Sequence, residues 1–179
     1  MDERGPDSAR GRYPVFLDAN FILACVFPDE VHHDAAWRLL GEFSEAVRNG
    51  AAPPVVSTRV LEEVVWTSCR LLYDREHEPG AFAQLPPTGQ FRLLSRQSRP
   101  LRQLATRLLS DDAPYRVLPL TADDCSAAFT LATARGIPLP DAMHVAMARR
   151  LCGGFIVTND RHMRALPDVT CITYGLPAE

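Results

Sequence analysis

The sequence contains no lysine: all 19 basic residues among its 179 residues are arginine. Set against 22 acidic residues, they leave a formal net charge of −3 at pH 7. A chain with this balance lacks the global positive field that many nucleic-acid-binding proteins carry. Binding to nucleic acid would therefore need a local cluster of arginines, whose guanidinium groups suit bidentate contacts to phosphate.

Long apolar runs are also absent, because none approaches the roughly 18 residues of a membrane-spanning helix. The first twelve residues, "MDERGPDSARGR", are charged and lack the apolar centre of a signal peptide. We therefore expect a mobile tail over 1–12, a cytoplasmic location and no membrane partner. The sequence has neither a GxSxG elbow nor a phosphate-binding P-loop, which argues against a serine hydrolase and a P-loop nucleotidase.

Cysteine is scarce, and no two of the five cysteines form a CxxC pair. Each lies beside apolar or small residues, so we predict buried, reduced thiols and no disulfide or zinc site. Apolar residues make up 46% of the chain, which is enough for one domain with a substantial core. The cysteines are Cys25, Cys69, Cys125, Cys152 and Cys171.

Short apolar runs alternate with helical patterns along the chain. This order predicts an α/β fold with three α/β/α layers around a short parallel sheet of about five strands. We expect one domain over 13–175, a mainly helical insertion over 74–114 and a short tail over 176–179. The predicted strands are 15–18, 53–57, 115–120, 155–160 and 169–173, and the predicted helices are 29–50, 59–74, 90–98, 100–112, 121–137 and 139–153.

Four acidic residues occupy comparable places in this pattern. Asp18 ends the first strand and Asp160 ends the fourth, while Asp141 opens a helix. Glu63 lies in the first turns of the helix after the second strand. Ligands bind at the carboxyl ends of strands in an open parallel sheet, so these acids plausibly share one edge. Together they would repel unless cations lay between them, and oxygen ligands suit Mg²⁺ or Mn²⁺.

Each acid also has an ordinary structural interpretation. Asp18 can cap the next helix, Asp141 suits a helix N-terminus, and Asp160 suits a turn. In the helix after the second strand, Glu62 could be the buried residue in place of Glu63.

Several polar residues could support the acids. Asn20 could form a hydrogen bond to a carboxylate or to a water, or it could simply stabilise a turn. Ser57 could serve the site, although a helix cap fits it better. Thr158 could orient Asp160, contact phosphate or be an ordinary strand residue. His144, three residues after Asp141, fits best as a packed helix histidine.

Arginines recur at 92, 96 and 99, at spacings of four and three that place them on one helix face. Arg92, Arg96 and Arg99 could contact an RNA backbone, or they could form a solvated face.

Four segments in order resemble the acidic motifs of PIN domains: "FLDANFIL", "VVSTRVLEEVVW", "PLPDAMHVAMA" and "IVTNDRHM". The resemblance spans about residues 13–175 and is closest to VapC-type toxins of bacterial toxin–antitoxin pairs. It implies that Asp18, Glu63, Asp141 and Asp160 are the catalytic, metal-binding acids. In the second motif the family's Glu follows the Ser by six positions, which selects Glu63. The resemblance also implies Mg²⁺ or Mn²⁺ as cofactor, a homodimer and a small antitoxin partner.

The sequence and the resemblance together predict a metal-dependent endoribonuclease that hydrolyses RNA phosphodiester bonds with a metal-activated water. Its expected role is the toxin of a toxin–antitoxin pair. Two alternatives stay open: an RNA-processing nuclease with the same fold but no antitoxin, and a non-catalytic RNA-binding module. The presence of all four acids argues against the second.

Overall fold

The structure is a computed structural model that describes residues 14–176. The predicted tail at 1–12 and the last three residues of the predicted tail at 176–179 lie outside the described residues. The chain forms two compact units. The first comprises the described residues up to Val60 and those from Pro114 onward, and the second is Leu61–Ala113.

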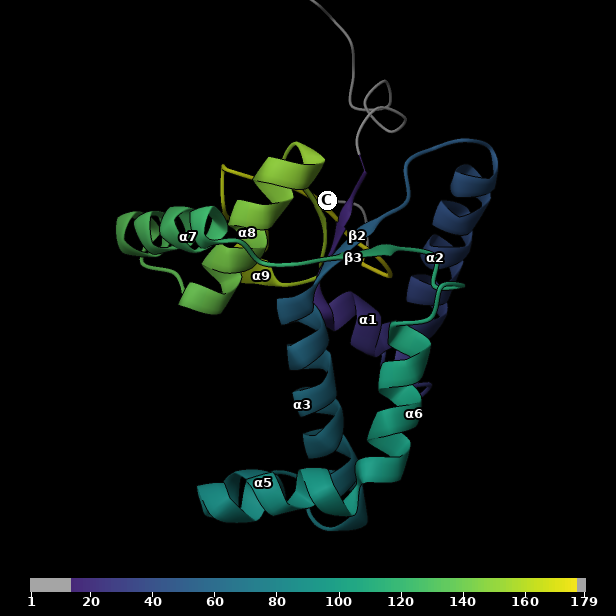
Figure 1. Cartoon of the computed structure of the whole chain (residues 1–179), viewed down its shortest axis with the longest axis vertical. Helices are drawn as coiled ribbons and strands as arrows, with labels where there is room; N and C mark the ends of the chain where they lie inside the picture. Colours follow the sequence, from purple (N-terminus) through teal and green to yellow (C-terminus); the bar gives the residue numbers. More distant parts are fainter. Residues whose placement is uncertain (1–13, 177–179) are drawn as a thin grey trace, which may run out of the picture. The chain divides into compact units, whose positions relative to one another are not determined.

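A parallel sheet of five strands forms the centre of the first unit, in the order β3-β2-β1-β4-β5 (Figure 1). Strand β1 is central, because Phe16 pairs with Val55 on one side and with Ile156 on the other. The prediction of a parallel α/β fold is confirmed. The strands are β1 Phe16–Leu17, β2 Val55–Ser57, β3 Arg116–Leu118, β4 Phe155–Val157 and β5 Thr170–Ile172.

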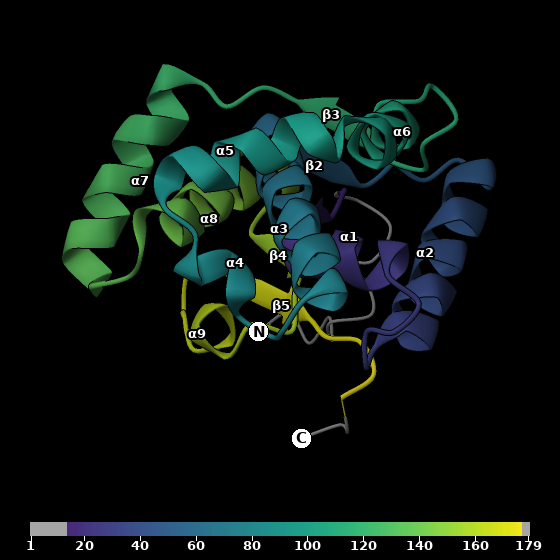
Figure 2. The ribbon, with the colours of Figure 1, turned by 90° about the horizontal axis from the view of Figure 1, so that it is seen from below.

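Helices flank this sheet on both sides. Figures 1 and 2 show α7 and α8 on one side and α1 and α2 on the other. Helix α8 packs against β1, β2 and β4, and Phe16, Leu17 and Ile156 are fully buried. Burial on both faces explains why the strands lack a polar–apolar alternation. The helices are α1 Ala19–Val26, α2 His33–Arg48, α7 Ala122–Arg135, α8 Leu139–Cys152 and α9 Arg161–Arg164.

The second unit is helical and has a core of its own. Helix α3, Thr58–Glu76, begins directly after β2 and supplies most of its length to this unit. Cys69, Phe82, Leu93 and Leu101 form the buried cluster, and the rings of Trp66 and Phe82 meet edge to face at 5.5 Å. Helices α4 Ala81–Gln84, α5 Pro87–Arg96 and α6 Ser98–Leu108 complete the unit and fall within the segment predicted as a helical insertion.

All five cysteines are free thiols, as predicted. Cys25, Cys69 and Cys152 are buried, whereas Cys125 and Cys171 are only half-buried. Burial raises the pKa of Cys25 and of Cys152 to about 12. These two thiols therefore stay protonated at neutral pH, and protonated thiols are poor nucleophiles and poor metal ligands. In residues 14–176 no helix is long and apolar enough to cross a membrane.

Candidate functional site

Asp18 lies at the junction of β1 and α1, with only 4% of its surface exposed. Its Oδ1 accepts a hydrogen bond from the Ala19 backbone N–H at 2.7 Å, so the side chain does serve as the N-cap of α1. The Asp18 carboxylate can accept further hydrogen bonds, because an ionised Asp offers about four acceptor positions on its two oxygens.

Two side chains from distant parts of the sequence also contact Asp18. The Thr158 hydroxyl donates to Oδ2 at 2.8 Å, and His144 Nδ1 lies 3.1 Å from Oδ1. Burial acts to raise the pKa of Asp18, but the hydrogen bonds and charge of His144 and the bonds from Thr158 and Ala19 outweigh it and lower that pKa. Asp18 is therefore ionised at neutral pH. An ionised carboxylate has no proton to give, so His144 Nδ1 is the donor in that contact.

The Thr158 side chain connects two of the predicted acids. It is fully buried at the end of β4. Its Oγ1 donates to Asp18 and accepts from the Asp160 backbone N–H at 3.0 Å. Asp160 in turn caps the short helix α9, since its Oδ1 accepts from the His162 N–H at 2.6 Å. One hydroxyl thus fixes the loop that carries Asp160 relative to Asp18.

Asp141 lies in the first turn of α8 and is half-buried. Burial raises its pKa, and the negative charges of Asp160 and, less strongly, Asp18 raise it further, so that together they outweigh the lowering by His144 and His162. The three aspartates are therefore close enough to interact electrostatically. They come from the ends of β1 and β4 and from the start of α8, the sheet edge that the sequence pattern indicated.

The fourth predicted acid, Glu63, lies on α3 in the second unit. Glu63 is half-buried and Glu62 is exposed. Within residues 14–176 no three His, Cys, Asp or Glu side chains are gathered as a ready-made metal cluster. The assignment of the four acids as metal ligands remains a prediction.

The supporting residues differ in their surroundings. Ser57 is fully buried and its Oγ accepts from the Val60 N–H at 3.0 Å, which is the predicted helix cap. Asn20 is exposed on α1. His144 is only 2% exposed, so it is packed as expected, but it also contacts Asp18. The sequence interpretation missed that contact, although the spacing of His144 from Asp141 on one helix offered a signal.

The arginine segment is not one helix, so the prediction of a single shared helix face is wrong. Helix α5 ends at Arg96, and Arg99 belongs to α6. Gln97 closes α5, and Pro100 has no N–H to extend the same helix, so a new helix starts at Ser98. Arg92, Arg96 and Arg99 are all exposed.

Comparisons with known proteins agree with this architecture. The PIN domain family model matches residues 15–169. Among solved structures, VapC20 of Mycobacterium tuberculosis, described as a toxin that cleaves the sarcin–ricin loop, is 21% identical with a TM-score of 0.51. The match covers 87% of this chain and 98% of that one.

A second similar structure is VapBC2 from Rickettsia felis, bound to a DNA fragment from its promoter. It is 12% identical with a TM-score of 0.52, over 89% of this chain and 98% of that one. A comparison with curated protein sequences gives no match. The match of the family model to most of the chain establishes its membership: the protein belongs to the PIN domain family.

Proposed function

We propose that this protein is a metal-dependent endoribonuclease and the toxin of a toxin–antitoxin pair. The observation that carries the proposal is the buried, ionised Asp18, held by Thr158 and His144 beside two further aspartates. Placing a buried anion next to like charges is costly for folding, and such arrangements gather at functional sites.

The residues fit a divalent cation. Asp18, Asp141 and Asp160 offer oxygen atoms only, which suits Mg²⁺ or Mn²⁺. A cation among them would offset the repulsion that raises the pKa of Asp141. We assign Glu63 as the fourth ligand because its motif position matches and it is the less exposed of the two neighbouring glutamates. A bound ion would supply water activation and charge stabilisation at the scissile phosphate.

The chain's own residues position this chemistry. Thr158 and His144 keep Asp18 ionised and oriented, and the backbone N–H of Asp160 is tied to the same hydroxyl. Asp141 accepts a proton more readily than an isolated aspartate, because burial and its neighbours raise its pKa. Asn20, exposed at the start of α1, is proposed to hold a water or a carboxylate. Arg92, Arg96 and Arg99 are proposed to contact the RNA backbone.

The partners follow from the similar structures, one described as an RNA-cleaving toxin and one as a VapBC pair. We propose a small antitoxin, a homodimer and a cytoplasmic setting. A PIN-like nuclease without an antitoxin is distinguished by the neighbouring gene, since a small antitoxin-like reading frame favours the toxin. A non-catalytic RNA-binding module is distinguished by the cleavage assay.

The test is RNA cleavage with Mn²⁺ by the parent and by Asp18→Asn. Loss of the charge at a nearly isosteric side chain should reduce cleavage by about a hundredfold or more, while circular dichroism stays unchanged. Asp123→Asn, an exposed charge change on α7, is the matched control and should cleave like the parent. Full cleavage by a folded, nuclease-free preparation of Asp18→Asn would rule the assignment out.

A further inference from the structure

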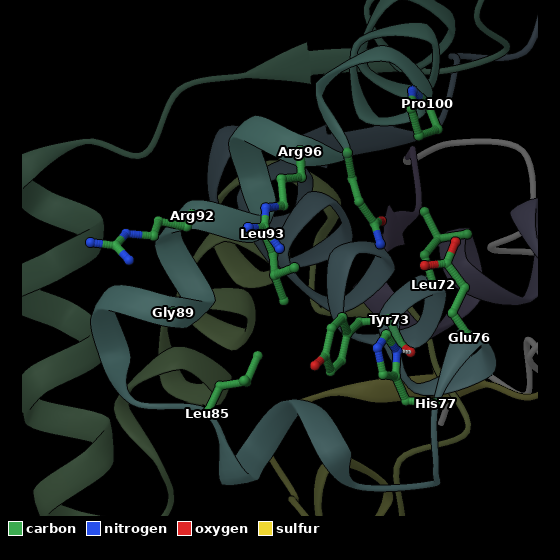
Figure 3. Close-up of a pocket in the computed structure, with 11 residues that line it drawn as sticks. Leu72, Tyr73, Glu76, His77, Leu85, Gly89, Arg92, Leu93, Arg96 and Pro100 are labelled. Carbon is green, nitrogen blue, oxygen red and sulfur yellow. Dashed lines mark hydrogen bonds between the residues drawn. The ribbon is translucent and has the colours of Figure 1, made fainter.

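A cavity of about 540 Å³ lies in the second unit (Figure 3). Its lining residues fall between Leu72 and Pro100, and none of them is one of the four predicted acids. Pockets for small organic ligands typically hold about 300–1,000 Å³, so the space accommodates one nucleotide.

The walls of the cavity combine apolar side chains with a pair of flat rings. Leu72, Leu85 and Leu93 line it, and Leu93 is only 7% exposed. The rings of Tyr73 and His77 stack with centroids 4.0 Å apart and an interplanar angle of 18°. Figure 3 shows the two rings next to each other, between Leu85 on one side and Leu72 and Glu76 on the other. Flat rings beside leucines form a surface on which a nucleobase can stack.

Polar groups complete the lining. The Gln97 Oε1 is buried, and no group among the described residues donates a hydrogen bond to it. This oxygen therefore has no surface that a ligand in the cavity can reach, and the charged side chains of the lining are Glu76, Arg92 and Arg96. Arg96 extends beside Leu93, while Arg92 points away from the other labelled side chains (Figure 3). Arg96 is thus the cation best placed to meet a phosphate on a ligand in the cavity.

The helices that carry these groups are also the basic part of the chain. Residues 87–108 contain five arginines and no acid. Since the whole chain carries −3, the remaining residues sum to −8. All five arginines are exposed. A polyanion is therefore attracted to α5 and α6 and repelled from the rest of the surface on average.

We propose that this cavity binds one unpaired nucleotide of a single-stranded RNA. The base stacks in the space between the leucines and the Tyr73–His77 pair, and the phosphate meets Arg96. The inference deepens the proposed function, on which it rests, by assigning a subsite for substrate outside the acidic residues. An acidic peptide satisfies the arginines but brings no planar base for the ring pair, so RNA is the better occupant.

Binding is tested on the full chain in EDTA, where no cleavage occurs. A fluorescently labelled short single-stranded RNA and the four nucleoside monophosphates are the probes. Arg96→Gln should weaken RNA binding about tenfold, because a charge-assisted hydrogen bond is lost. Arg107→Gln removes the same charge from α6 without lining the cavity, and should change affinity less than about twofold.

Equal losses in Arg96→Gln and Arg107→Gln would overturn the proposal in favour of diffuse attraction. Competition by an acidic peptide as strong as that by RNA of equal charge would also overturn it, as would a failure of every monophosphate to bind. Arg96 is exposed, so its variant tests the proposal without removing a buried side chain. Cleavage by the parent with Mn²⁺ is measured in a separate experiment. If the cavity does not bind nucleotides but the parent cleaves RNA, the proposed nuclease function is unaffected.

Discussion

The hydroxyl of Thr158 supports both the fold and the candidate site. It is fully buried, donates to one aspartate and accepts from the backbone of another. A valine of the same shape would leave the Asp18 Oδ2 and the Asp160 N–H without this partner. Thr158 therefore contributes to the fold and to the site through the same two bonds.

We predict that Thr158→Val lowers the free energy of unfolding by about 1–3 kcal/mol, since two buried polar groups lose their partner. Urea denaturation measures the loss. Thr130→Val, in which an exposed threonine on α7 is changed, is the control and should stay within about 0.5 kcal/mol of the parent. Equal stability of the two variants would show that the Thr158 hydroxyl bonds contribute nothing net.

The raised pKa of Asp141 predicts how the stability of the protein changes with pH. Its folded pKa is raised above the ordinary 3.8, so the native state binds protons more tightly there than the unfolded chain. The resulting stability is complete below pH 3.8 and is lost as pH rises through the folded pKa. Asp141→Asn should therefore melt above the parent at neutral pH in EDTA, and the advantage should vanish in acid.

The control for Asp141→Asn is Asp34→Asn, because Asp34 is an exposed acid in the first turn of α2. Both variants lose the favourable interaction of an acid with a helix N-terminus, about 0.3–1 kcal/mol. Only Asp141→Asn also removes the cost of burying a charge and the repulsion from neighbouring aspartates. If the two variants shift the melting temperature alike at every pH, the interpretation that burial and like charges raise the pKa of Asp141 fails.

Among the helices, α7 and α8 are joined by one buried acid. Asp124 is only 2% exposed. It completes a capping box with Thr121 and accepts two hydrogen bonds from Arg150, at 2.6 and 2.8 Å. Burial acts to raise the pKa of Asp124, but the bonds from Arg150 and Thr121 outweigh it and lower that pKa. Asp124 therefore belongs to the framework that carries α8 and, with it, Asp141.

We predict that Asp124→Asn costs about 1–2 kcal/mol at neutral pH, because charge-assisted bonds are weakened. The folded pKa of Asp124 is depressed, so its stabilisation is present above pH 3.8 and is lost as pH falls through the folded pKa. The gap between parent and variant should therefore close in acid. Asp123→Asn, the exposed neighbour on the same turn, serves as control. A gap independent of pH would contradict the charge-based explanation.

The elements were largely predictable because their signals are local. Thr121 with Asp124 marks the start of α7, and Gly153 marks the end of α8. Helices α4 and α9 were missed, since four residues are too few for a periodicity to show, and α1 was given no bounds beyond the suggestion that Asp18 caps a helix. The single arginine face failed although the break between two helices was predicted, because Arg99 lies beyond the break and belongs to the second helix.

The site was predictable only in part. Asp18, Asp141 and Asp160 could be placed at one sheet edge from strand and helix ends alone. The contact of His144 with Asp18 spans 126 residues of sequence, and the Thr158 contact spans 140. Contacts of this range depend on how strands and helices pack, which no local pattern contains.

For the molecule as a whole, a shared metal site would couple ion binding to stability. A ligand that binds only the folded state stabilises it by an amount that grows with its concentration, about 2.7 kcal/mol at a hundred times the dissociation constant. We predict that Mn²⁺ raises the melting temperature of the parent more than that of Asp160→Asn. Equal responses to Mn²⁺ would mean that Asp160 does not belong to a metal site.

The place of β1 at the centre of the sheet also has a consequence for the order of events during synthesis. Its partner β4 and the hydroxyl that holds Asp18 are made about 140 residues later. Until that part of the chain has left the ribosome, Asp18 lacks the hydrogen bond from Thr158 and β1 lacks one of its two neighbours. We expect nascent chains that stop before Phe155 to be open to proteolysis. A ribosome would thus carry a precursor with an incomplete sheet and an incomplete candidate site for most of the time it takes to make the chain.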